Sequence, residues 1–187
     1  MDPVDDSTHA SDRIANVDHV AIAVHSIADA VPLFCDALGA RFLTGGDNDE
    51  TGIRLVHLQL PGMKLELMQP LRDDSILAAH LARRGAGFHH MTFFVDDVLS
   101  TVEALESDGI PTTGTDVSTP YWSETFIKPA ASFGALMQFV SSTRTWGVAT
   151  DEFTLADVLA GQIVWREHLA CIRETGAGRG SRPLGAG

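Results

Sequence analysis

Residues 17–24 read VDHVAIAV and residues 88–95 read FHHMTFFV, and these two stretches decide the fold of the chain. Both are short runs rich in β-branched or aromatic side chains, a composition typical of β-strands. Each carries a central histidine, His19 in the first and His90 in the second, and the two histidines are 71 residues apart. The chain is therefore predicted to contain two copies of one module, each opening with a strand.

A helix is predicted after each opening strand, at residues 26–39 and 96–109, because both stretches end in a glycine that would stop a helix. Strand-like segments separated by turn signals follow both helices, at 41–43, 52–60 and 63–68 in the first copy and at 110–113, 124–128 and 135–140 in the second. The order β-α-β-β-β thus occurs twice. We predict an α+β fold in which modules 16–70 and 87–142 build one domain, 16–145.

The two ends of the chain lie outside the repeat. Residues 1–15 are polar and acidic and are predicted to be a disordered tail, and the glycine-rich residues 174–187 a second, flexible tail. Residues 150–173 are predicted to be a C-terminal helix, because Thr154 and Asp157 have the spacing of a capping box. Its apolar face would consist of Leu155, Val158, Leu159, Ile163, Leu169 and Ile172. We expect this helix to pack on the sheet or against a partner subunit.

The net charge of −12 limits the partners of the chain. An acidic surface repels phosphate backbones and anionic lipid headgroups, so we expect neither nucleic acid nor a membrane as a partner. Hydrophobic residues make up 44% and charged residues 20%, as in globular proteins, but no apolar run is long enough to span a bilayer. The N-terminus has no basic start followed by an apolar run, and Cys35 and Cys171 form no disulfide framework. We therefore expect a cytoplasmic protein with reduced cysteines.

Four polar residues occupy related strand positions in the two modules. His19 and His90 lie in the opening strands, while Glu66 and Gln138 lie in the last strands, 72 residues apart. If the modules pair about a pseudo-two-fold axis, all four side chains converge on one point. Two imidazoles and a carboxylate suit one divalent cation such as Zn, Co, Ni, Mn or Fe(II). Gln138 would add an oxygen ligand, or a water molecule would occupy that coordination position. His89 competes with His90, because a shift of one residue turns the other face of a strand toward the site.

Four segments carry a resemblance to a known family: DHVAIAV (18–24), ELMQPL (66–71), RRGAGFHHMTFFVDD (83–97) and PAASFGALMQFV (129–140). They resemble the vicinal oxygen chelate superfamily, and within it the methylmalonyl-CoA epimerases and their glyoxalase relatives. The resemblance covers residues 17–141 and implies an eight-stranded, cupped, mixed sheet around one divalent metal ion. It also implies, by position, the metal ligands His19, Glu66, His90 and Gln138, with the second histidine of the pair as the ligand.

The acid–base residues of the epimerases are replaced in this chain. The resemblance implies two glutamates that take and return a proton next to the thioester, but their positions hold Leu55 and Gln138. Neither side chain can transfer a proton near neutral pH. His57 shares a strand face with Leu55, and an imidazole is a group that can accept a proton near neutral pH, so His57 is the leading candidate for the base. Glu124 and Tyr121, at the start of the seventh strand, are the alternatives.

Three functions remain open. In the first, a metal-dependent enzyme stabilises an enolate or oxyanion of a carbonyl or acyl-thioester substrate and acts as an isomerase or lyase. In the second, the same ligands hold Fe(II), and the protein is a dioxygenase or an oxygenative rearrangement enzyme. In the third, the fold binds a small molecule, such as a drug, without catalysis. We expect a small-molecule partner, with an anionic acyl thioester as the first candidate, and a homodimer.

Overall fold

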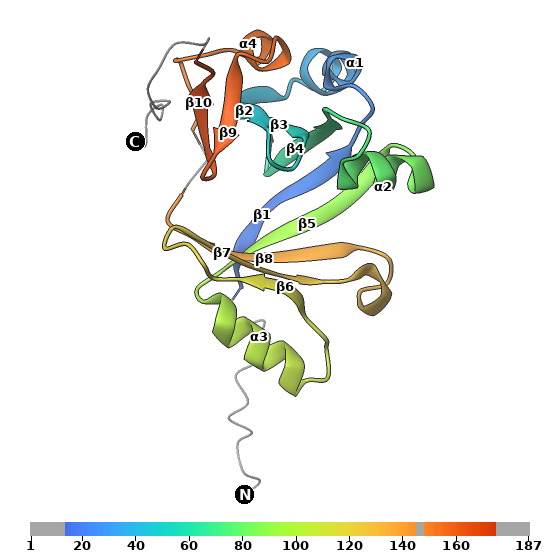
Figure 1. The fold of residues 1–187 in the computed structure, drawn as a ribbon, viewed down its shortest axis with the longest axis vertical. Coiled ribbons are helices and arrows are strands. Elements are labelled where there is room, and N and C mark those ends of the chain that lie inside the picture. Colours follow the sequence, from blue (N-terminus) through green and yellow to red (C-terminus); the bar gives the residue numbers. More distant parts are fainter. Residues whose placement is uncertain (1–13, 145–147, 175–187) are drawn as a thin grey trace, which may run out of the picture. The chain divides into compact units, whose positions relative to one another are not determined.

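The computed structural model describes residues 14–144 and 148–174, which fall into two compact units; Figure 1 labels their elements. Of the described residues, unit 1 contains residues 14–18 together with His90–Thr143, and unit 2 contains His19–His89 together with Arg144 and residues 148–174. Strands β1 (Ile14–Ala23) and β5 (Gly87–Val95) each pass from one unit into the other.

Unit 2 holds the first βαβββ module. After β1 come α1 (Ile27–Val31), a π-helical turn (Pro32–Ala37), β2 (Arg41–Asn48), β3 (Ile53–Leu60) and β4 (Met63–Pro70). The strands lie in the order β2-β3-β4-β1, with β4 and β1 parallel and the other pairs antiparallel. The predicted helix 26–39 changes character at Pro32, because proline has no N–H to continue the α-helical hydrogen bonds.

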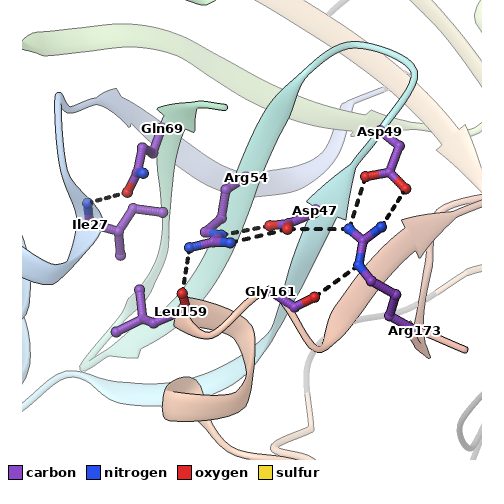
Figure 2. Close-up of polar contacts among 8 residues, drawn as sticks. All are labelled: Ile27, Asp47, Asp49, Arg54, Gln69, Leu159, Gly161 and Arg173. Carbon is purple, nitrogen blue, oxygen red and sulfur yellow. Dashed lines mark hydrogen bonds and ion pairs between the residues drawn. The ribbon is translucent and has the colours of Figure 1, made fainter. Parts of the chain in front are cut away.

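The helices α1 and α2 of unit 2 are each attached to the sheet at defined points. Ser26 caps α1 with its hydroxyl, and the side-chain oxygen of Gln69 on β4 accepts the backbone N–H of Ile27 at 2.8 Å (Figure 2). After β4, α2 (Ile76–Arg84) packs against β1 and β4 in a buried cluster of Ala21, Ala23, Met68, Leu77 and Leu81. By strand alternation, α2 therefore covers the face of β1 that also carries His19.

Unit 1 repeats the module. Its elements are β5, α3 (Val98–Ser107), β6 (Thr113–Asp116), β7 (Trp122–Ile127), a 3-10 turn (Pro129–Ala131) and β8 (Leu136–Ser142). The strand order is β5-β8-β7-β6, with β5 and β8 parallel. Asp97 caps α3 by accepting the N–H of Ser100 at 2.7 Å. The helix packs on the sheet through Val95, Val98, Leu105, Ile127 and Phe139. The repeated order confirms the predicted fold class, α+β with a mixed sheet.

The predicted C-terminal helix is wrong over most of its length. Residues 150–173 contain a five-residue helix, α4 (Leu155–Leu159), followed by a hairpin of β9 (Ile163–Arg166) and β10 (Leu169–Ile172). The hairpin continues the sheet of unit 2 in the order β10-β9-β2. The described residues thus contribute ten strands, where eight were predicted.

Local conformation explains why the helix stops early. The capping box of Thr154 and Asp157 is present and starts α4 as predicted. Gly161 then adopts a left-handed φ of 72°, which takes the chain out of the helical path. The β-branched Ile163 and Val164 that follow favour an extended conformation. Apolar residues that fit one helical face therefore belong to a short helix and two short strands.

The predicted tails lie mostly outside the described residues. Residues 1–13 and 175–187 are not described, nor are 145–147, where the predicted domain ends. Ile14 and Ala15, predicted to be part of the first tail, already belong to β1. Among the residues that are described, no helix is long and apolar enough to cross a bilayer.

Candidate active site

Three strands of unit 2 bring His19, Glu66 and His57 onto one face of the sheet. In the strand register, Glu66 on β4 lies opposite His57 on β3 and opposite Ala21 on β1. His19 is two residues from Ala21, so strand alternation turns it to the same side. The pairing therefore groups two predicted metal ligands with the predicted base.

The carboxylate of Glu66 lies between two imidazoles. Its Oε2 is 3.7 Å from Nε2 of His19, and its Oε1 is 3.4 Å from Nε2 of His57. The two rings meet edge to face with centroids 5.5 Å apart. All three side chains are buried, and His57 is only 1% exposed. A buried carboxylate next to the imidazole of His19 provides two donor atoms for a divalent transition metal.

The spacing of these atoms fits a bound ion. Two ligand atoms about 2.1 Å from a tetrahedral ion lie roughly 3.4 Å apart, close to the 3.7 Å between His19 and Glu66. Imidazole nitrogen and carboxylate oxygen are also donors for Zn, Co, Ni, Mn and Fe(II). His19 and Glu66 can therefore hold such an ion, with the imidazole of His57 beside the ligating carboxylate.

Leu55 lies in apolar surroundings. It is opposite Met68 in the pairing of β3 and β4, and it packs against the buried cluster under α2. Leu55 is two residues from His57 on the same face, so the apolar cluster lies next to the buried polar group. At this position, where the resemblance implies a catalytic glutamate, the side chain can shape an apolar wall but cannot accept a proton.

A second group of polar side chains lies on one face of unit 1. Thr92 on β5 is opposite Gln138 on β8, and Phe126 on β7 flanks Gln138 on the other side. Alternation places His90 and Glu124 on this same face, two residues from Thr92 and Phe126 respectively. His90 is buried and Glu124 is half-buried. Three of the predicted site residues thus share one surface of unit 1.

A chain of hydrogen bonds connects these side chains. The hydroxyl of Thr92 donates to Oε1 of Gln138 at 2.7 Å, and Nε2 of Gln138 donates to Oε2 of Glu124 at 2.8 Å. The indole N–H of Trp122 donates to the same carboxylate oxygen at 2.9 Å. These bonds give the amide of Gln138 a defined orientation. They also fix the carboxylate of Glu124, on the neighbouring strand β7, through two N–H donors.

Tyr121 contributes its backbone to the junction of β7 and β8. Its carbonyl accepts hydrogen bonds from the hydroxyl of Ser142 at 3.0 Å and from the N–H of Thr143 at 3.3 Å. These bonds extend the pairing of the two strands past the start of β7. Glu124, one of the two alternatives to His57 as the base, is thus hydrogen-bonded to Gln138 through its side chain.

His89 faces the other side of β5 from His90, since neighbouring residues of a strand alternate. Its ring centroid lies 4.5 Å from that of His80 on α2. Burial, and to a lesser extent the neighbouring His80, lower the pKa of His89 to about 4, so this imidazole is neutral at pH 7. His89 therefore belongs to a separate histidine pair in unit 2.

Trp165 contacts a predicted site residue, a contact that was not predicted from the sequence. It lies on β9, and its indole stacks on the imidazole of His57 with ring centroids 5.8 Å apart and 27° between the planes. A helix over 150–173, as predicted, gives no reason to expect this contact. The run IVW after Gly161 is the local signal that indicates a strand instead.

A known family matches the part of the chain that carries most of these residues. Residues 18–125 match the model of the glyoxalase/bleomycin resistance protein/dioxygenase superfamily. The match covers more than half of the chain and includes His19, Glu66, His90 and Glu124. The chain therefore belongs to this superfamily, which confirms the resemblance described above. Gln138 and the C-terminal hairpin lie beyond the matched residues.

Within the superfamily, the chain is similar to epimerases. The ethylmalonyl-CoA/methylmalonyl-CoA epimerase of Cereibacter sphaeroides is 33% identical over 97 residues, which make up 51% of this chain and 72% of the relative. The crystal structure of methylmalonyl-CoA epimerase from Mycobacterium tuberculosis superposes with a TM-score of 0.62 and 29% identity, covering 73% of this chain and 92% of that one. A variant of the Streptomyces coelicolor methylmalonyl-CoA epimerase in complex with 2-nitronate-propionyl-CoA gives 0.60 and 26%, over 70% and 99%. These relatives are isomerase-type enzymes.

Proposed function

We propose that this protein is a divalent-metal-dependent enzyme that stabilises the enolate or oxyanion of an acyl-thioester substrate and acts as an isomerase or lyase. The epimerase relatives support an isomerase-type reaction, and the relative bound to a propionyl-CoA derivative supports an acyl-CoA substrate. The observation that carries the proposal is the buried pair of His19 and Glu66, because the 3.7 Å between their ligand atoms suits one bound ion.

In this proposal His19, Glu66 and His90 hold the ion. The first two lie together in unit 2, and His90 is the counterpart of His19 in the second module, 71 residues later. Gln138 is the fourth ligand, or it lies beside the ligands and leaves the fourth position to water; its Oε1 accepts a hydrogen bond from Thr92. When bound, the metal acts as a Lewis acid that stabilises negative charge on a substrate oxygen.

Glu124 is the base that the side-chain geometry supports best. Its carboxylate is held by Gln138 and Trp122, and the residue is only half-buried, which suits a group that takes a proton from a substrate. His57, which is favoured by the sequence, is 1% exposed and lies against Glu66. We therefore propose Glu124 as the catalytic base and His57 as a partner that orients Glu66.

A dioxygenase is the second candidate function. Two histidines and one carboxylate with open positions are the ligand set of non-haem Fe(II) oxygenases. His19, Glu66 and His90 would form such a set. The bound metal discriminates between the candidates: Fe(II) with oxygen consumption supports the oxygenase, whereas Zn, Co, Ni or Mn supports the isomerase.

The test combines metal analysis with proton exchange. The purified protein is analysed by inductively coupled plasma mass spectrometry and then incubated with methylmalonyl-CoA or ethylmalonyl-CoA in D2O. We expect replacement of the α proton by deuterium, followed by NMR, to require the ion and to stop after treatment with EDTA. With one base in place of two, exchange should be faster than inversion of the α carbon. A metal-loaded protein that exchanges no α proton would contradict the proposed reaction.

A further inference from the structure

The C-terminal segment, defined as residues 148–174, is built into unit 2 although it lies beyond the residues that match the superfamily. Its strand β9 pairs in parallel with β2, where Val164 is the partner of Asp47. Strand β10 then pairs antiparallel with β9. The segment therefore extends the sheet of the first module by two strands.

Gly46 on β2 allows β9 to approach. A Cβ atom at this position would lie 2.9 Å from the carbonyl carbon of Val164 and 3.1 Å from the backbone nitrogen of Trp165. Both are main-chain atoms, so no side-chain rotation could relieve the contact. Glycine in a strand commonly marks such a close approach of another backbone. The glycine at position 46 of β2 therefore leaves room for the backbone of β9 to lie beside it.

Hydrogen bonds of two arginines connect the C-terminal segment to the sheet, as Figure 2 shows. Arg54 on β3 donates to both carboxylate oxygens of Asp47, at 2.6 and 3.0 Å, and to the carbonyl of Leu159 at 2.8 Å. Arg173, just after β10, donates to the two carboxylate oxygens of Asp49 at 2.8 and 2.9 Å. Hydrogen bonds between charged groups are roughly twice as strong as neutral ones. The segment is therefore held in one position relative to β2 and β3.

This attachment places Trp165 on the ring of His57, and both side chains are buried. We infer that Trp165 is a positioning residue: it holds the imidazole of His57 against the carboxylate of Glu66, and so makes the C-terminal segment part of the active site. The inference rests on the proposed function to the extent that Glu66 is taken to be a metal ligand.

The physical reason is that a stacked ring restricts its partner to one plane. In that plane Nε2 of His57 lies 3.4 Å from Oε1 of Glu66. Groups that orient a ligating side chain commonly contribute 10–100-fold to metal affinity. A smaller side chain at position 165 would leave space into which the imidazole of His57 can turn. Loss of Trp165 should therefore weaken metal binding without removing a ligand.

The experiment compares Trp165→Leu with Phe153→Leu as a matched control. Phe153 lies in the same segment, is also buried, and packs its ring on that of Phe42 with centroids 5.9 Å apart. Phe42 lies opposite Leu58, the neighbour of His57 on β3, so this pair is on the other face of the sheet. Calorimetric titration with Zn gives the metal Kd, and NMR of the metal-free protein gives the ring-current shifts of the His57 C–H resonances. Trp165→Phe tests rescue and replaces Trp165→Leu if that variant does not fold.

We expect Trp165→Leu to raise the Kd for Zn about 10–100-fold and to shift the His57 resonances. Trp165→Phe should restore most of the affinity, and Phe153→Leu should leave both measurements near wild type. Equal losses of affinity in the two leucine variants would overturn the inference, because a general loss of packing would then explain them. Unchanged His57 resonances in Trp165→Leu would overturn it as well. A wild-type protein without affinity for any of the candidate metals refutes the proposed function instead, and the His57 resonances still decide whether Trp165 holds that ring.

Discussion

The side-chain amide of Gln138 donates from Nε2 to Oε2 of Glu124 at 2.8 Å, between the antiparallel strands β8 and β7. The resemblance to the epimerases implies a glutamate at the position of Gln138. In this chain a carboxylate lies on the neighbouring strand instead, and the amide connects it to Thr92. A proton acceptor is thus present on the same face of unit 1, although the residue on β8 cannot serve as one.

Replacement of Glu124 by glutamine should remove the base. We expect α-proton exchange to fall about 10²–10⁴-fold, the usual contribution of a positioned base, while the metal content stays unchanged. Exchange in D2O followed by NMR measures the effect. Glu106→Gln is the matched control, because Glu106 is an exposed glutamate on α3 of the same unit. Full exchange in Glu124→Gln, together with lost exchange in His57→Gln, would return the role of base to His57.

Replacement of Glu66 by alanine should release the bound ion. The change removes one of two donor atoms that lie 3.7 Å apart in unit 2 and leaves His19 without its carboxylate partner. Mass spectrometry of the purified variant gives the number of metal ions per chain. Glu152→Ala changes an exposed glutamate of the same unit and should keep the wild-type value. Full occupancy in Glu66→Ala would show that Glu66 is not a ligand.

Replacement of Asp47 by alanine should destabilise unit 2 strongly. The side chains of Asp47 and Arg54 are 7% and 11% exposed, and removing one partner of such a buried ion pair typically costs about 3–5 kcal/mol. Asp74→Ala is the control, because its ion pair with Arg72 is largely exposed and should contribute less than about 1 kcal/mol. Urea unfolding gives both free energies. Equally small losses would show that other contacts hold the C-terminal segment.

Asp49 should make the attachment of the C-terminal segment sensitive to acid. The side-chain hydrogen bond from Arg173 lowers the pKa of Asp49 below its ordinary value of 3.8. Because the folded-state pKa is lowered, the pair stabilises the protein fully above the unfolded-state pKa, and this contribution is lost as the pH falls through the folded-state pKa. The difference in unfolding free energy between wild type and Asp49→Asn should therefore be largest near pH 7 and shrink below about pH 4. A difference that does not change with pH would contradict the role of this carboxylate.

The strands that carry the site could be predicted because their signals are local. The predicted strand 17–24 is observed as β1, and the predicted strand 88–95 as β5. Alternation along such strands is enough to place His19 and Glu66 on one face once β1 and β4 pair. The same rule separates His90 from His89. Local periodicity therefore accounts for both modules and for which residues share a face.

The C-terminal segment could not be predicted in the same way. An apolar face at helical spacing also fits two short strands, so periodicity alone does not decide between them. The contact of Trp165 with His57 joins residues far apart in the sequence. It depends on the close approach of β9 to Gly46 and on the hydrogen bond from Arg54 to the carbonyl of Leu159. No local pattern specifies these tertiary contacts.

The hairpin of β9 and β10 also decides which strand ends the sheet of unit 2. Without it, β2, eight residues long, would present an unpaired row of backbone N–H and C=O groups, on which strands of other molecules can add and start aggregation. With it, the outermost strand is β10, four residues long, and very short edge strands are one means by which proteins prevent such growth. Truncation of the chain after α4 should therefore produce a protein that aggregates, even if the remaining strands keep their conformation and pairing.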